Sequence, residues 1–122
     1  MATEAPVQNL TLEAGADLSA KQYHCVKLSS GKAVLCAAGE DALGVLQNKP
    51  SLGEAAVYMR LGLSKCAAAA AIAEGASVAA AADGRIETAG SGDYVIGKAK
   101  AAAAGAGSII SVELTLSGVA LP

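Results

Sequence analysis

The adjacent residues His24 and Cys25 carry two side chains that could act together as base and nucleophile, and His24 is the single histidine of the chain. A catalytic pair of this kind needs a hydrogen bond between the imidazole and the thiol. The residues around the pair are typical of a β-strand, and neighbouring side chains of a strand point to opposite faces. We therefore expect an ordinary histidine at this position and no catalytic dyad.

The three cysteines, Cys25, Cys36 and Cys66, are also candidates for chemistry, either as metal ligands or as disulfide partners. They lie 11 and 30 residues apart along the chain, and neither spacing is typical of a metal site. An odd number of cysteines in a protein that stays in the cytoplasm argues against a disulfide framework. We expect all three to be small buried apolar residues.

Acidic residues and glycine-rich loops are the remaining candidates for chemistry. Glu40, Asp41 and Asp93 lie in expected turns, where acidic side chains bind local backbone groups, whereas a catalytic pair of carboxylates would face across a cleft. The segments "GSGDYV" and "GAGSII" begin like a dinucleotide-binding loop, but both lack its third glycine. The sequence therefore predicts no enzyme, no cofactor and no metal site.

The elements that would position any site are built from an unusual set of residues. Of the 122 residues, 53% are hydrophobic, yet Phe and Trp are missing and only three residues are Tyr. The core must therefore consist of Val, Leu, Ile and Ala, which bury less area per residue than aromatic side chains do. A single domain of this size has little stability to spare, so we expect association with copies of itself or with a partner.

Charge and hydropathy exclude two classes of partner. The net charge is −2 and no run of Lys or Arg occurs, so the sequence lacks the basic face that binds nucleic acid. The longest apolar run, Cys66–Ala73, has 8 residues, far fewer than the roughly 20 that span a membrane. The N-terminus has no signal-peptide pattern, so we expect a soluble protein that stays in the cytoplasm where it is made.

The sequence resembles itself with an offset of 53 residues. Segment 31–44 aligns with segment 84–97, so that three glycines fall on three glycines, and the apolar alternation that follows each segment keeps the same register. Upstream, the register continues after the insertion of one residue. This self-similarity predicts an internal duplication. The two repeat halves are about 14–62 and 68–116.

Alternation with a period of two residues predicts strands. In the segment 55–61, for example, Val57, Met59 and Leu61 occupy one face, opposite a tyrosine and an arginine. Turn signals recur about every ten residues, which is typical of small sandwiches and barrels. The expected class is all-β, a small barrel or sandwich built from two duplicated halves with a short N-terminal arm. The expected strands are 7–12, 24–28, 33–37, 42–47, 55–61, 63–69, 78–81, 86–88, 94–99 and 109–116.

The stretch 65–75, "KCAAAAAIAEG", is the one place where propensity and pattern disagree. Alanine is the best helix former, but the repeat aligns this stretch with "AGADLSAKQ", in which a glycine and an aspartate mark a turn. We therefore expect the end of a strand followed by a turn. A single helical turn around 70–74 stays open.

Three stretches together resemble the small capsid cement, or head decoration, proteins of tailed bacteriophages. They are Ala14–Leu28, Gly39–Lys65 and Asp83–Ala99, and the most specific part is "A-x-G-V-L-Q-N-x-P-x-x-G-E" at Ala42–Glu54. The resemblance implies a small all-β protein that adds to the outside of an assembled head and stabilises the lattice by bridging capsid subunits. The alanine-rich segment 66–82 departs from the family pattern.

The resemblance also implies partners and a location. The partner would be the major capsid protein of a tailed phage, and the final location would be the outer capsid surface of the virion, after assembly in the host cytoplasm. Analogy with decoration proteins at threefold positions implies a homo-oligomer, with a trimer favoured. The family has no catalytic motif that could be matched to this chain.

The N-terminal residues 1–13 are expected to form an arm and a first strand, ahead of a single β domain at 14–122. Residues 2–9, "ATEAPVQN", hold too few apolar groups to fold alone. They form either a frayed terminus or an arm that orders on the capsid by adding to a strand edge there. The possible capsid contacts are Thr3, Glu4, Val7, Asn9 and Leu10.

Two other functions fit a small β domain. Lipoyl and biotinyl carrier domains present one lysine at a hairpin tip, whereas the lysines here lie in "QNKPS" and "LSKCA", at Lys49 and Lys65. A carbohydrate-binding module on the virion surface would stack sugars on aromatic side chains, and three tyrosines are a small supply for this purpose. Both functions stay open as alternatives.

Overall fold

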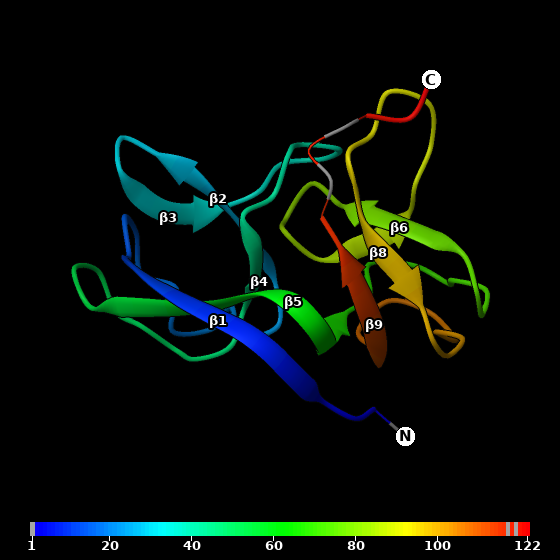
Figure 1. Ribbon diagram of the computed structural model, residues 1–122, viewed down its shortest axis with the longest axis horizontal. Helices are drawn as coiled ribbons and strands as arrows, with labels where there is room; N and C mark the ends of the chain where they lie inside the picture. Colours follow the sequence, from blue (N-terminus) through cyan, green and yellow to red (C-terminus); the bar gives the residue numbers. More distant parts are fainter. Residues whose placement is uncertain (1, 117, 119) are drawn as a thin grey trace.

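The computed structural model describes the whole chain except Met1, Ser117 and Val119, and it is an all-β protein. The described residues form nine strands and no helix (Figure 1). The strands are β1 (Ala5–Glu13), β2 (Cys25–Ser29), β3 (Lys32–Leu35), β4 (Gly44–Leu46), β5 (Ala55–Ala67), β6 (Ser77–Ala80), β7 (Ile86–Thr88), β8 (Val95–Ala99) and β9 (Ile109–Thr115).

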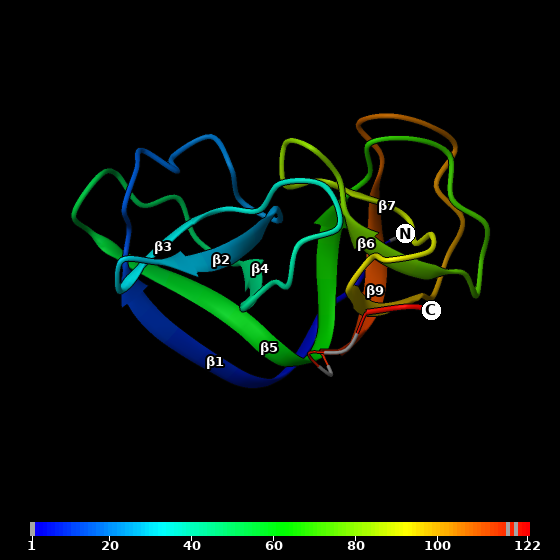
Figure 2. The same ribbon diagram turned by 90° about the horizontal axis from the view of Figure 1, so that it is seen from above.

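All nine strands belong to one antiparallel sheet. Its order is β3-β2-β4-β5-β9-β8-β6-β7, and β1 pairs with the opposite edge of β5. The 13-residue β5 is therefore the centre of the sheet: the first part of its length pairs with β1 and β4 from the first half of the chain, and the last part pairs with β9 from the second half. The sheet curves strongly, as a partly closed barrel rather than two stacked sheets (Figures 1 and 2). The expected all-β class is confirmed.

One expected strand boundary is wrong, because the strands predicted at 55–61 and 63–69 are the single strand β5. Gly62, the residue read as a break, continues the strand with a φ of 124°. This conformation is open to glycine and strained for other residues, so the glycine bends the strand without ending it. The described residues thus form nine strands where ten were expected.

The alanine-rich stretch contains no helix. Strand β5 ends at Ala67, and the chain then makes isolated bridges from Ala68 to Ile86 and from Ile72 to Ala103. The N–H of Ala69 donates to the carbonyl of Ile86 at 2.8 Å. Because backbone groups of this stretch bond to distant parts of the chain, tertiary pairing outweighs the helix propensity of alanine. The expected strand end followed by a turn is confirmed.

The same pairings recur in the two halves of the fold. Bonds from the first half reappear in the second with an offset of 53 or 54 residues at each end. The N–H of Gly15 bonds to the carbonyl of Ala33 and that of Ala69 to Ile86, while the N–H of Leu18 bonds to Pro50 and that of Ile72 to Ala103. These bonds describe a structural correspondence, and a duplication of the sequence itself stays a prediction.

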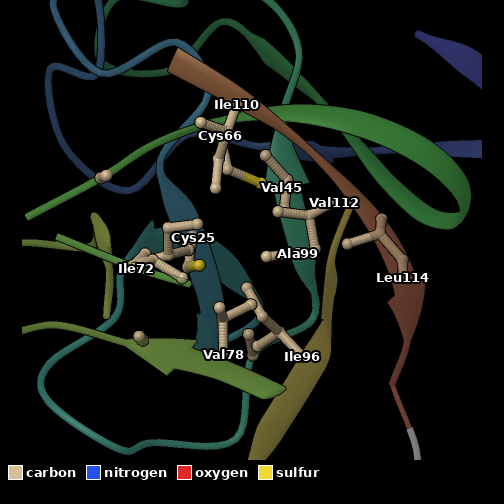
Figure 3. Packing of buried hydrophobic residues seen from close by; sticks show 14 of the residues in the cluster. Cys25, Val45, Cys66, Ile72, Val78, Ile96, Ala99, Ile110, Val112 and Leu114 are labelled. Carbon is tan, nitrogen blue, oxygen red and sulfur yellow. The ribbon is translucent and has the colours of Figure 1, made fainter. Parts of the chain in front are cut away.

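The core consists of two clusters of small and medium-sized apolar side chains. The larger cluster joins both halves, with Cys25 and Val45 packed with Ile96, Val112 and other residues (Figure 3). The smaller cluster lies within the first half and contains Tyr58, the one aromatic residue of the two buried clusters. The expected core of Val, Leu, Ile and Ala is thus confirmed, with cysteine and methionine added.

Candidate functional site

His24 and Cys25 lie in different surroundings. The imidazole Nδ1 of His24 is 3.0 Å from the carbonyl oxygen of Gln22, whereas Cys25 is fully buried in the larger core cluster. The histidine side chain therefore contacts a loop carbonyl, and the cysteine side chain packs among apolar neighbours.

All three cysteines are free and buried, as expected from the sequence. Burial raises the pKa of the thiols of Cys36 and Cys66 to about 12, and it raises the pKa of Cys25 well above its ordinary value. A thiol is nucleophilic or metal-binding as its thiolate. At neutral pH these three groups therefore remain protonated and serve as apolar packing.

The acidic residues of the expected turns bind groups of their own chain. Glu40 forms an ion pair with Lys27 at 2.7 Å and accepts the N–H of Ala37 at 2.7 Å, and both bonds hold the pKa of its carboxyl below the ordinary value. Asp93 accepts the N–H of Gly90 at 2.9 Å. Among the described residues, no group of three or more His, Cys, Asp and Glu side chains is arranged to hold a metal ion.

One open groove of about 490 Å³ lies beside the ion pair of Lys27 and Glu40. The charges of Lys27 and Glu40 in its lining pair with each other. Its lining residues are Lys27, Leu28, Glu40, Asp41, Ala42, Leu43 and Tyr94.

The two lysines that a carrier domain would use lie in different places: Lys65 within a strand, and Lys49 in the loop that joins the paired strands β4 and β5. Lys65 lies within β5, where it pairs with Glu4 at 3.7 Å, and its ammonium is 5.8 Å from the centre of the Tyr23 ring. Lys49 is exposed in the connection between β4 and β5. No helix in the part of the chain that the structure describes is long and apolar enough to cross a membrane.

The most exposed element of the sheet is β1. Eight of its nine residues are exposed, and Leu12 is half-buried against the smaller core cluster. The strand pairs with β5 from Ala5 to Glu13, with register shifts around Gln8. Its other edge faces outward along the side of the molecule (Figures 1 and 2). This strand contains three of the five residues expected to contact a partner.

The N-terminal arm is shorter than the sequence indicated. Residues Ala5–Asn9, expected to belong to an arm at 2–9, lie in β1 and follow β5. The preceding Thr3 bonds to the buried Ser111 of β9, whose hydroxyl accepts the Thr3 N–H at 2.6 Å and donates to the Thr3 carbonyl at 3.0 Å. The segment needs few apolar groups because its backbone is held by the neighbouring strands.

The five expected contact residues therefore divide into two groups. Thr3 and Glu4 are engaged within the chain, by Ser111 and Lys65 respectively. Val7 is 72% exposed and Leu10 is 39% exposed, and Asn9 is also exposed between them.

Sequence reasoning missed Leu61, a third exposed apolar residue, which lies on β5. Leu61 pairs with Gln8 of β1 and is 49% exposed. The alternation had placed it on one face with Val57 and Met59, of which Met59 is fully buried. The bend at Gly62 directly follows Leu61, and a period-two pattern does not report such a bend.

Comparison with known proteins finds a family model and solved structures that match the chain. The family model described as phage cement protein matches residues 3–114. The crystal structure of the N base of head fiber gp8.5 in bacteriophage phi29 has a TM-score of 0.73 to this chain, with 17% sequence identity over 90% of this chain and 95% of that chain. At this identity the second match shows a shared fold. No curated protein sequence matches the chain.

Proposed function

Because the chain belongs to the phage cement protein family, we propose that it binds the outer surface of a phage head and stabilises the capsid lattice by bridging capsid subunits. The observation that carries this proposal is the extent of the family match. Residues 3–114 include β1 to β8 and all but the last residue of β9. The whole sheet therefore belongs to a structural protein of the phage virion.

The physics of the fold supports a bracing role. A protein that binds only the assembled lattice shifts the equilibrium away from rupture, by an amount set by its affinity and concentration. Bracing needs a rigid body with exposed contact surface, and it needs no reactive group. The continuous sheet, whose larger core cluster joins both halves, supplies the rigid body, and exposed apolar residues such as Val7 and Leu61 supply contacts.

The partner in this proposal is the major capsid protein of a tailed phage. A homo-oligomer, with a trimer favoured, would touch several capsid subunits at once. Linked contacts raise the overall affinity by about 10²–10⁴-fold over a single contact. The protein would be made in the host cytoplasm and would end on the outer capsid surface.

A sedimentation experiment tests the proposed function. Purified protein is mixed with phage heads that lack it, the heads are pelleted, and bound copies per head are counted. We expect saturable binding and a higher temperature of head rupture in the decorated sample. Dissociated capsid protein, which lacks the lattice, serves as the control. Absence of binding, or binding that leaves head stability unchanged, would contradict a cement role.

A further inference from the structure

Strand β1 has one paired edge and one open edge. Along its length it pairs with β5. Two residues after the end of β1, the N–H of Gly15 donates to the carbonyl of Ala33 in β3. Among the described residues, none pairs with the outer edge between Ala5 and Thr11.

The bond of Gly15 also shows which backbone groups point outward. Along a strand, the N–H groups of alternate residues point to the same edge. Since the Gly15 N–H points to β3, on the side away from β5, the N–H groups of Asn9 and Thr11 point to that same outer edge. These groups and their carbonyls form a ready template for another strand.

The composition of β1 leaves this edge unprotected. Edge strands usually carry charged residues or prolines that prevent pairing with other chains, but the segment 5–12 holds no charge and one proline, near its start. The flanking acids are neutralised within the chain, Glu4 by Lys65 at 3.7 Å and Glu13 by Lys32 at 3.3 Å. A long, neutral and exposed edge promotes aggregation unless a partner covers it.

The strand that corresponds to β1 in the second half of the fold is covered in this way. Residues 63–67 of β5 pair with residues 109–113 of β9 as residues 9–13 of β1 pair with residues 55–59 of β5, with an offset of 54. The other edge of β5 carries β1, through the pairs of Gly62 with Pro6 and of Leu63 with Ala5. At Leu63, which corresponds to Asn9 of β1, this position in the fold therefore accepts an added antiparallel strand.

We propose that the outer edge of β1 binds an extended, uncharged segment of the capsid protein as an added β-strand. This inference rests on the proposed function, because the family supplies the capsid as partner. Backbone hydrogen bonds to Asn9 and Thr11 give the affinity, and the exposed side chains of Val7 and Leu10 contact the side chains of the added segment.

The variant Thr11→Pro tests this proposal. Proline removes the outward N–H and leaves the ladder to β5 intact, and it is tolerated on the solvent side of edge strands. The matched control, Thr11→Val, keeps the N–H and the β-branched shape. We expect Thr11→Pro to keep the β-sheet circular dichroism spectrum and to bind phage heads at least tenfold more weakly, whereas Thr11→Val binds like the unmodified protein.

A second pair of variants decides the matter if Thr11→Pro fails to fold. Val7→Lys places a charge on the edge at an exposed position, and Leu28→Lys places the same charge on β2, where the leucine is 58% exposed. We expect Val7→Lys to weaken head binding at least tenfold and Leu28→Lys to leave it unchanged.

The outcomes separate this inference from the proposed function. If the unmodified protein does not bind heads, both fail. If it binds and the edge variants that fold bind equally well, the edge is unused and only the strand-docking proposal is overturned. If light scattering shows that the free protein is an oligomer and that Thr11→Pro is a monomer, a second copy covers the edge, which overturns the capsid segment as its occupant.

Discussion

Gly62 lies directly opposite Pro6 where β1 crosses the bend of β5. A Cβ atom at Gly62 would lie 2.6 Å from the carbonyl oxygen of Ala5 and 2.7 Å from the backbone nitrogen of Val7. The φ of 124° at Gly62 also disfavours any other residue. One glycine therefore bends the central strand and makes room for the strand that we propose binds the capsid.

We predict that Gly62→Ala lowers the free energy of unfolding by about 2 kcal/mol, because backbone strain of this kind costs about 1–3 kcal/mol. Urea denaturation measures the loss. Gly105→Ala is the matched control, since a Cβ at Gly105 meets open space and its φ is not in the left-handed region. Equal stability of the two variants would contradict the role of Gly62.

Gly44 and Gly97 occupy corresponding places in the two halves. Neither has a positive φ, but a Cβ at either position would overlap a carbonyl oxygen of the neighbouring strand, that of Met59 for Gly44 and that of Glu113 for Gly97. We predict that Gly44→Val and Gly97→Val each lower stability by more than about 1 kcal/mol, the scale of overpacking. Thermal denaturation of both variants checks this, and a neutral result at either position would refute the correspondence.

Deletions at the N-terminus should show that the segment belongs to the sheet. Removing residues 2–9 deletes the pairing of Ala5 to Asn9 with β5 and the bonds of Thr3 to Ser111. We predict a loss of more than about 2 kcal/mol, since each hydrogen bond contributes about 1 kcal/mol. Removing residues 2–4 alone should cost less. An unchanged thermal midpoint after the longer deletion would show that these residues are not held by the sheet.

The buried cysteines should make stability depend on pH in the alkaline range. The pKa of Cys36 rises from 9.0 to about 12 on folding, so between these values the unfolded chain has lost a proton that the folded chain keeps. The unfolded state then binds fewer protons, and stability falls as pH rises above about 9. Urea midpoints between pH 8 and 11 measure the slope.

Comparison with Cys36→Ala isolates the contribution of this thiol to that slope, because tyrosines and lysines titrate in the same range. We expect a flatter decline in the variant. In the native protein at pH 8, a thiol reagent should also react slowly with all three cysteines and rapidly after unfolding. Parallel stability curves, or fast labelling of a native thiol, would contradict the burial of these groups.

Most strands could be predicted from the sequence because alternation reports which face of a strand is buried. The strands at 86–88 and 94–99, for example, lie within one residue of β7 and β8. The same pattern contains no information on strand edges. It therefore did not show that Ala5–Asn9 pair with β5, or that the outer edge of β1 stays open.

The candidate site could be predicted from the sequence only in part, for a related reason. The exposure of Val7 and Leu10 followed from a polar N-terminal sequence, whereas that of Leu61 depends on a bend at Gly62. Glycine in a strand indicates either a break or a bend, and only the long-range pairing of β5 with β1 and β9 decides between them.

A cryo-electron microscopy reconstruction of phage heads decorated with this protein tests the central claim most directly. The account predicts that the protein lies on the outer surface with β1 against the shell, and that each bound oligomer contacts at least two neighbouring capsid subunits. Density inside the head, or bound oligomers that each touch a single capsid subunit, would contradict a protein that stabilises the lattice by bridging.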